Sequence, residues 1–142
     1  MAAFEEGYQC LIESTANPSV AFYEIEITPL DMSAARYNVS TQRNTNVHTY
    51  AFSQLKDTGS VTILAAWAGE AIDDGKAMLG VNDEWTITFP DGSTEVFYGA
   101  MTEFKPSGMK IGDRPTVSIT IGSSNVDPTD NTEAQPTFTA AT

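Results

Sequence analysis

The chain has 142 residues, of which 41% are hydrophobic, and its seven basic and nineteen acidic side chains give a formal net charge of −12. This length allows one compact core, and so large an acidic excess argues against a surface that binds nucleic-acid phosphates or anionic membrane. The single cysteine excludes an intrachain disulfide, and no secretory signal or membrane-length apolar stretch is visible, so we expect a soluble protein folded in a reducing cytoplasm.

Two strands are expected first, at 8–13 and 21–28. In the second strand large apolar side chains alternate with acidic ones, which predicts one buried face and one polar face. The buried face would carry Tyr23, Ile25 and Ile27. Glu24 and Glu26 would then share the polar face.

The segment 29–55 shows no sustained periodicity and is rich in Asn, Ser, Thr, Arg and Gln. A connection this long inside a compact domain is usually functional or disordered. Its interspersed aromatic residues favour burial at an interface, and its arginines would pair with an acidic neighbouring surface. We therefore expect a long loop that orders against another surface, with a short hairpin as one way of doing so. The candidate contact residues are Arg36, Tyr37, Arg43, His48, Tyr50 and Phe52.

A continuous apolar strand is expected at 60–67, followed by the one convincing helix at about 71–80. Apolar positions recur there at helical spacing, and Gly80 is suited to cap the end of the helix. Gly75 lies on the apolar face, where the missing Cβ would let the helix approach a sheet closely.

A β-hairpin is expected at 85–98, because apolar and polar residues alternate from Trp85 to Phe89. Pro90, Asp91 and Gly92 form its turn, in which Gly92 is free to take positive φ. We expect both tryptophans, Trp67 and Trp85, to face the core.

A Gly/Pro-rich loop at 106–116 feeds a further strand at 117–121. The segment 123–142 is polar and low in aromatics, and we expect a flexible or extended C-terminal arm.

No constellation of catalytic residues is visible. His48 is the single histidine and lies in the polar segment with no nucleophile motif near it, while Cys10 reads as a small strand hydrophobe. Asp127, Asp130 and Glu133 do not have the spacing of an EF-hand loop. We therefore expect no enzyme, no metal site and no cofactor.

The order of several motifs resembles the major tail proteins, or tail-tube proteins, of long-tailed bacteriophages (siphophages). The resemblance begins at Ile27-Thr-Pro-Leu and continues through the short helix. The motifs that carry it are Leu55-Lys-Asp-Thr-Gly-Ser, Phe89-Pro-Asp-Gly-Ser and Pro106-Ser-Gly-Met-Lys-Ile-Gly-Asp-Arg-Pro. It implies a mainly β, two-sheet, sandwich or barrel-like fold with one flanking α-helix, a long loop and extended N- and C-terminal arms.

The resemblance also implies a function. Residues 1–122 would form the tail-tube β domain, with 29–55 as the loop between rings and 123–142 as the C-terminal arm, without a second immunoglobulin-like domain. Six copies would form a ring whose inner sheets join into one barrel, and stacked rings would form the tube through which viral DNA passes. Expected partners are further copies of the chain and the tail terminator, tape-measure and distal tail proteins, with no membrane. The location would be the virion of a phage or of a gene-transfer-agent-like particle, assembled in the host cytoplasm.

A tube wall that conducts DNA should not attract phosphate, and a ring of six copies would carry about −72 formal charges before screening. Candidates for the wall are Glu24, Glu26, Thr86, Thr88 and Glu95. These residues fit equally well as ordinary solvent-facing positions of a sandwich.

Two alternatives remain open. The first is a monomeric β-sandwich binding module, for example for carbohydrate, although core-facing tryptophans would leave no aromatic platform. The second is the tube protein of a contractile tail or of a phage-related secretion system.

Overall fold

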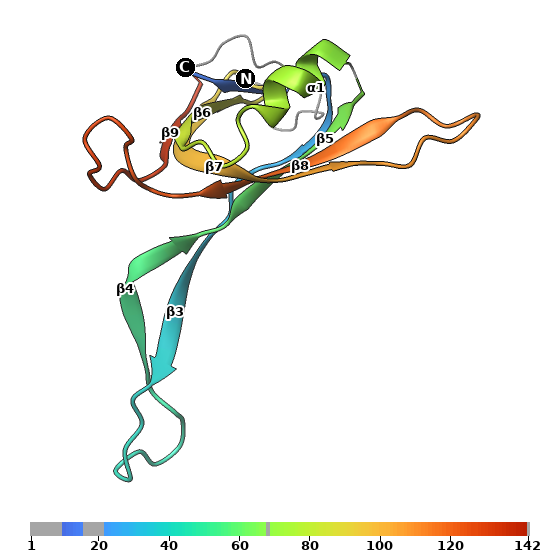
Figure 1. The fold of residues 1–142 in the computed structure, drawn as a ribbon. Coiled ribbons are helices and arrows are strands. Elements are labelled where there is room, and N and C mark those ends of the chain that lie inside the picture. The colour runs from blue at the N-terminus through green and yellow to red at the C-terminus, as the bar shows by residue number, and fades with distance from the viewer. Residues whose placement is uncertain (1–9, 16–21, 68, 142) are drawn as a thin grey trace.

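The computed structural model describes residues 10–15, 22–67 and 69–141 (Figure 1). One antiparallel sheet of seven strands forms the body, with β1-β6-β7-β8-β5-β2 as its order and β9 paired to β7. A separate two-stranded sheet, β3-β4, stands away from the body (Figure 1). The elements are β1 (Leu11–Ser14), β2 (Glu24–Thr28), β3 (Met32–Asn38), β4 (Tyr50–Thr58), β5 (Ser60–Ala66), α1 (Gly69–Lys76), β6 (Asp83–Thr88), β7 (Thr94–Pro106), β8 (Thr116–Ser123) and β9 (Thr137–Thr139).

The large sheet folds over into two layers because β7 is long enough to belong to both. Its first half pairs with β6 and its second half with β8, and the register shifts between Met101 and Glu103. The outer strands β1 and β2 approach one another, and the Ile12 amide donates to Glu24 Oε1 at 3.5 Å. No strand pair among the described residues closes the sheet into a barrel. The predicted fold class is confirmed: mainly β, two sheets and one short helix.

The core lies between the two layers, where alternate residues of β5, β6 and β8 point inward. Trp85 and Phe97 are opposite one another in the β6–β7 pair and are fully buried. The Trp85 indole donates to the Gly99 carbonyl at 3.0 Å, which satisfies its one polar atom. The expectation for Trp67 is wrong: β5 ends at Ala66, and Trp67 is 38% exposed beyond it.

Helix α1 covers one end of this core (Figure 1). A Cβ at Gly75 would lie 2.8 Å from Phe22, so the missing side chain does permit the close approach. The helix is shorter than expected, since it ends at Lys76 and the amides of Met78 and Leu79 bond three residues back in tighter turns. Gly80 follows with φ +79°. The side chains of residues 71–72, expected on the apolar face, lie outside the described part of the chain.

The segment 29–55 forms a β-hairpin, with a long connection at 39–49 between its two strands. Strands β3 and β4 pair from Met32–Thr58 to Asn38–Tyr50, with an irregularity between Ala34 and Arg36. Every residue of β3 is exposed, so neither face of the strand is buried. Because no face is buried, apolar residues do not recur at every second position, and the sequence shows no strand periodicity there.

The C-terminal arm is extended along the body. Strand β9 pairs with the start of β7, where Phe138 lies opposite Glu95, and the Phe138 ring lies 6.0 Å from the Phe89 ring. The expected N-terminal arm lies outside the described residues. In the described part of the chain, no helix has the length and apolar character needed to cross a membrane.

Candidate functional site

The β3–β4 hairpin, called the arm below, carries the largest group of exposed apolar side chains among the described residues. Its large apolar side chains are uncovered: Met32 is 50%, Tyr37 57%, Tyr50 41%, Phe52 66% and Leu55 81% exposed. Soluble monomers rarely leave so many neighbouring apolar side chains in water, and such patches mark interaction surfaces. The arm is therefore the first candidate for a contact with another protein chain.

The arm has internal order that fixes the directions of its side chains. The Arg36 guanidinium lies 4.2 Å from the centre of the Tyr50 ring, a cation–π contact across the two strands. At the tip, Ser40 Oγ hydrogen-bonds His48 Nδ1 at 3.1 Å and accepts the Thr49 amide at 2.9 Å. His48 thus has a structural contact with Ser40. Arg43 lies in the same tip, where its amide donates to Thr41 Oγ1.

A second surface is the outer face of the β2-β5-β8-β7 layer, called the polar sheet face below. Opposite residues of paired strands share a face, so the registers define two rows across four strands. The rows are Glu26, Leu64, Ser118 and Lys105, then Thr28, Thr62, Thr120 and Glu103. This face combines hydroxyl side chains with two acids and one base, whereas the residues behind it are the buried core. The sequence analysis found only Glu26 here, although the alternation of β5 and β8 already marks Thr62, Ser118 and Thr120 as outward.

The expected shared face of Glu24 and Glu26 is wrong. Strand β2 has a bulge between them, so Glu24 lies opposite the buried Ala65 while Glu26 lies opposite the outward Leu64. A bulge adds one residue and thereby reverses the alternation. Burial raises the pKa of the Glu24 carboxyl, in agreement with its position at the rim of the core.

The remaining wall candidates do not lie on the polar sheet face. Glu95 is opposite the buried Ile87, on the core side of β7, and burial raises its pKa. Thr86 and Thr88 point outward, but from β6 in the other layer. The structure therefore does not bring the five predicted residues together on one face.

The hairpin turn joins β6 to β7. The Gly92 amide donates to the Phe89 carbonyl at 3.0 Å, and Gly92 has φ +90°. Asp91 Oδ1 accepts hydrogen bonds from the Ser93 side chain and amide at 2.5 and 2.9 Å, which lowers the pKa of Asp91. Pro90 is the second residue of this hydrogen-bonded turn, as expected.

Reactive chemistry has little support in the described residues. They contain no group of three or more His, Cys, Asp or Glu residues that could hold a metal ion. Burial raises the pKa of the Cys10 thiol, which disfavours the nucleophilic thiolate. Asp127 and Asp130 accept hydrogen bonds from Thr129 and Thr132, so both carboxylates hold turns together.

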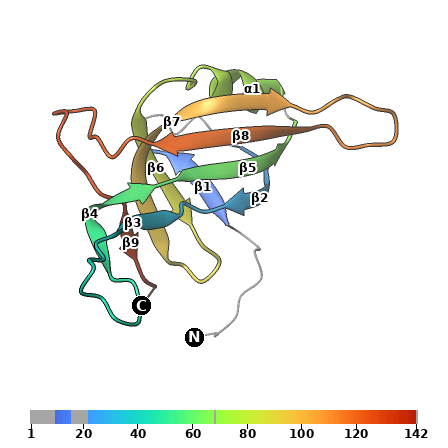
Figure 2. The same ribbon diagram turned by 90° about the horizontal axis from the view of Figure 1, so that it is seen from below.

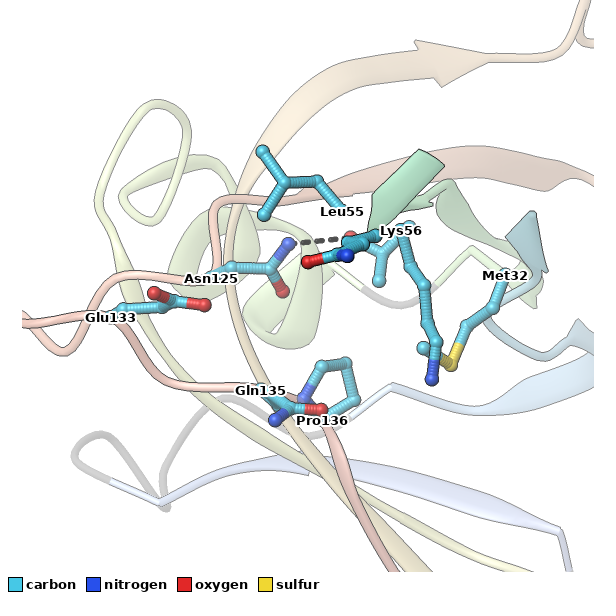
Figure 3. Close-up of a pocket in the computed structure, with 9 residues that line it drawn as sticks. Met32, Leu55, Lys56, Asn125, Glu133, Gln135 and Pro136 are labelled. Carbon is cyan, nitrogen blue, oxygen red and sulfur yellow. Dashed lines mark hydrogen bonds between the residues drawn. The ribbon is translucent and has the colours of Figure 1, made fainter. Parts of the chain in front are cut away.

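A pocket of about 190 Å³ lies between the base of the arm and the C-terminal segment (Figure 3). The arm contributes Met32, Leu55 and Lys56, and the C-terminal segment contributes Asn125, Glu133, Gln135 and Pro136. Asn125 Nδ2 donates to Thr58 Oγ1 at 2.8 Å, whereas its buried Oδ1 accepts no hydrogen bond from the described residues. The pocket could not be predicted from the sequence, since residues 32–58 form one side and residues 125–136 the other.

The sequence analysis also missed the tip of the β7–β8 loop. Met109 is 59% exposed and Ile111 is 101% exposed there. The sequence Lys110-Ile111-Gly112-Asp113 could have indicated it, because a glycine in the third position of a turn places the apolar Ile111 in the second position, at the corner.

Comparisons with known proteins establish the fold. No family model and no curated protein matches the chain. A chain of the virion of a native gene transfer agent particle aligns with a TM-score of 0.70 at 12% identity, covering 96% of this chain and 100% of that one. A chain of the tail of an empty gene transfer agent particle with C6 symmetry aligns with a TM-score of 0.66, at the same identity and coverage.

A third alignment is with a chain from the sheath/tube terminator structure of an extracellular contractile injection system. It has a TM-score of 0.71 at 10% identity and covers 99% of each chain. The alignments span nearly all of every chain compared, so the likeness extends to the whole fold and not to one motif. The chain described here therefore shares its fold with chains of gene transfer agent particles and of contractile injection systems.

Proposed function

We propose that this chain is the structural subunit of a viral tail tube, in a non-contractile phage tail or a gene-transfer-agent-like particle, and that it has no enzymatic activity. Copies form stacked hexameric rings, and the lumen of the stack conducts DNA during ejection. The observation that carries the proposal is the arm, whose exposed aromatic side chains have no use in a monomer. The shared fold supports it, because one of the aligned chains belongs to a tail with C6 symmetry.

In this proposal the arm contacts the next ring. Tyr37, Tyr50 and Phe52 become buried there, while Arg36 and Arg43 meet an acidic surface. Most of the chain's acidic excess lies on the body, so a neighbouring ring offers such a surface. Assembly should accordingly weaken at high salt.

The polar sheet face is the proposed wall of the lumen. Its acids Glu26 and Glu103 outnumber its one base, Lys105, and its other polar groups are hydroxyls, so the face does not attract phosphate and DNA passes without specific binding. Further partners would be the tail terminator, tape-measure and distal tail proteins. The location would be the virion, after assembly in the host cytoplasm.

A second candidate is the tube of a contractile system, which the alignment at TM-score 0.71 favours equally. It differs in having a sheath around the tube. A carbohydrate-binding module is less well supported, because Trp85 is fully buried and the two tryptophans therefore cannot form an aromatic platform together.

Electron microscopy of the purified, concentrated protein tests the proposal. We expect hollow tubes or rings with six-fold symmetry. A dispersed monomer at high concentration would overturn the proposal and favour the binding module. A sheath protein bound around the tubes in particles from the native source would decide for the contractile system.

A further inference from the structure

We propose that the tip of the β7–β8 loop inserts Ile111 into the pocket between the arm and the C-terminal segment of a second copy. Copies would then join head to tail. This contact rests on the proposed function, since it supplies the lateral contact that a ring requires. The occupant of the pocket is thus the loop of a second copy of this chain.

The inserting side is a preformed turn. The Asp113 amide donates to the Lys110 carbonyl at 3.1 Å, and Gly112 takes φ +92°, so Ile111 occupies the outer corner. The base of the loop is held by Ser107, whose amide and hydroxyl both donate to the Thr116 carbonyl at 2.9 Å. A fixed apolar corner loses little conformational freedom on docking.

The receiving side has the size for such a side chain, and three of its lining residues are apolar, beside six polar or charged ones: Gln54, Lys56, Thr58, Asn125, Glu133 and Gln135. Its volume of about 190 Å³ is comparable to the ~150 Å³ of an apolar cavity that holds one small hydrocarbon. Met32, Leu55 and Pro136 supply apolar contact (Figure 3). Asn125 also lines the pocket, and its buried Oδ1 accepts no hydrogen bond from the described residues.

The charges of the two sides are complementary. Basic side chains flank the inserting corner: Lys110 and Arg114, against the single acid Asp113. The charged residues of the C-terminal segment 123–136 are all acidic: Asp127, Asp130 and Glu133. Glu133 lines the pocket together with Lys56 of the arm, so the acidic surface on this side is completed by Asp127 and Asp130. Opposite charges around an apolar centre favour correct docking and disfavour contact between two like surfaces.

The two sides lie at opposite ends of strand β8. The loop precedes Thr116, the first residue of β8, and Asn125 follows its last residue by two positions. Figures 1 and 2 show the β7–β8 loop and the segment after β8 extending in opposite directions. A contact between two different surfaces is heterologous. Each copy inserts its loop into one neighbour and receives the loop of another in its pocket, so copies add in one direction until a ring closes.

Cysteine cross-linking tests the contact directly. In a Cys10→Ser background, one variant carries Ile111→Cys and a second, isotopically labelled variant carries Gln135→Cys, and the two are mixed and oxidised. We expect the mixed dimer to exceed both like-with-like dimers at least fivefold, and to diminish as salt is raised. A matched control replaces Ile111→Cys by Val47→Cys, an exposed apolar position (74%) at the arm tip. Equal cross-linking of 47 and 111 to 135, or dominant 111–111 dimers, would overturn the proposal.

Assembly of point variants separates this contact from the proposed function. Ile111→Asp should raise the concentration needed for assembly at least tenfold, with an unchanged melting temperature because Ile111 touches no core residue. Ile111→Leu should assemble like the wild type. If the wild type forms tubes and Ile111→Asp forms them equally well, the contact is wrong and the tail-tube function stands. If the wild type forms no tubes, the tail-tube function fails, and the cross-linking result still decides on the contact.

Discussion

Glu24 is the residue whose environment differs most from what its sequence neighbours suggest. The bulge in β2 turns it toward the seam between β1 and β2, where its carboxylate accepts the Ile12 amide at 3.5 Å. Burial raises its pKa, and the nearby Glu13 adds to the shift, against smaller opposing hydrogen bonds. A pKa that is raised on folding means that the folded state disfavours the charged carboxylate. The resulting loss of folding stability is absent below the unfolded pKa of 4.5 and develops as the pH rises through the folded pKa.

The first prediction follows from that sign. Glu24→Gln removes the charge but keeps an acceptor for the Ile12 amide. The melting temperature of the variant minus that of the wild type should be larger at pH 7 than at pH 4 by roughly 1–2 °C. Thermal unfolding at both pH values measures this, with the exposed Glu26→Gln as control. A constant difference between Glu24→Gln and wild type would mean that Glu24 is not buried at the seam.

Gly92 gives a second prediction at the residue scale. Because it has φ +90°, a β-branched side chain there should cost about 1–2 kcal/mol, and a Cβ would also approach Ala141 to 3.6 Å. Gly92→Val should lower the melting temperature by roughly 3–8 °C. The matched control is Gly108→Val, at a glycine with open space around a Cβ and no positive φ. Equal melting temperatures for the two variants would contradict the turn geometry.

At the scale of elements, the sequence predicts well where one face of a strand is buried without interruption. The sequences of strands β6 and β8 alternate as their burial does, so their inward residues, such as Trp85 and Ile119, could be identified from the sequence. Strand β5 alternates in burial, but its run Ile63–Ala66 is apolar throughout, so the sequence indicates a strand there without indicating which face is buried. Strand β2 has the same apparent alternation as β6 and β8, yet a bulge between Glu24 and Glu26 reverses it. The bulge depends on pairing with β5, which is a tertiary contact that no local pattern records.

The arm shows the opposite situation. Its strands have no buried face in the single chain, so the hydrophobic pattern that would identify them is absent. The pocket was equally hidden, because it forms where the arm meets the C-terminal segment. The exposed residues of the arm were nevertheless predicted as contact residues from their aromatic and basic character alone.

Shortening the arm is the third prediction. Arg36 and Phe52 are paired, so residues 37–51 can be replaced by Asn-Gly, which suits a two-residue hairpin turn. The variant should keep its melting temperature within roughly 2 °C, because the removed residues are mostly exposed and none belongs to the buried core. We expect no tubes by electron microscopy, although rings still form. Long tubes of normal stability would assign the arm another role.

At the scale of the whole molecule, charge is strongly segregated. Apart from Lys76 and Lys105, every basic residue lies on one of the two projections: Arg36, Arg43 and Lys56 on the arm, and Lys110 and Arg114 in the β7–β8 loop. Acids dominate the body between them. A net charge of −12 would by itself keep copies apart, so the basic projections give the chain a directed way to associate with its own acidic body.

The last prediction concerns the proposed wall. Glu26→Lys lies on the polar sheet face, opposite Leu64, and should leave the fold intact. It should make the lumen attract phosphate, so that assembled tubes retain DNA at low salt and release it steeply as salt rises. Wild-type tubes should retain none. Filter binding with short duplex DNA measures the difference.

The matched control is Glu13→Lys, which makes the same change of charge on the outer face of β1, in the other layer. A general loss of negative charge would raise DNA retention equally in both variants. If Glu26 faces the lumen, only the Glu26→Lys tubes retain DNA. Six lysines around one channel all act on the same DNA molecule, whereas six lysines on separate outer surfaces do not. Equal retention by the two variants would therefore remove Glu26 from the wall, while leaving the tube itself in place.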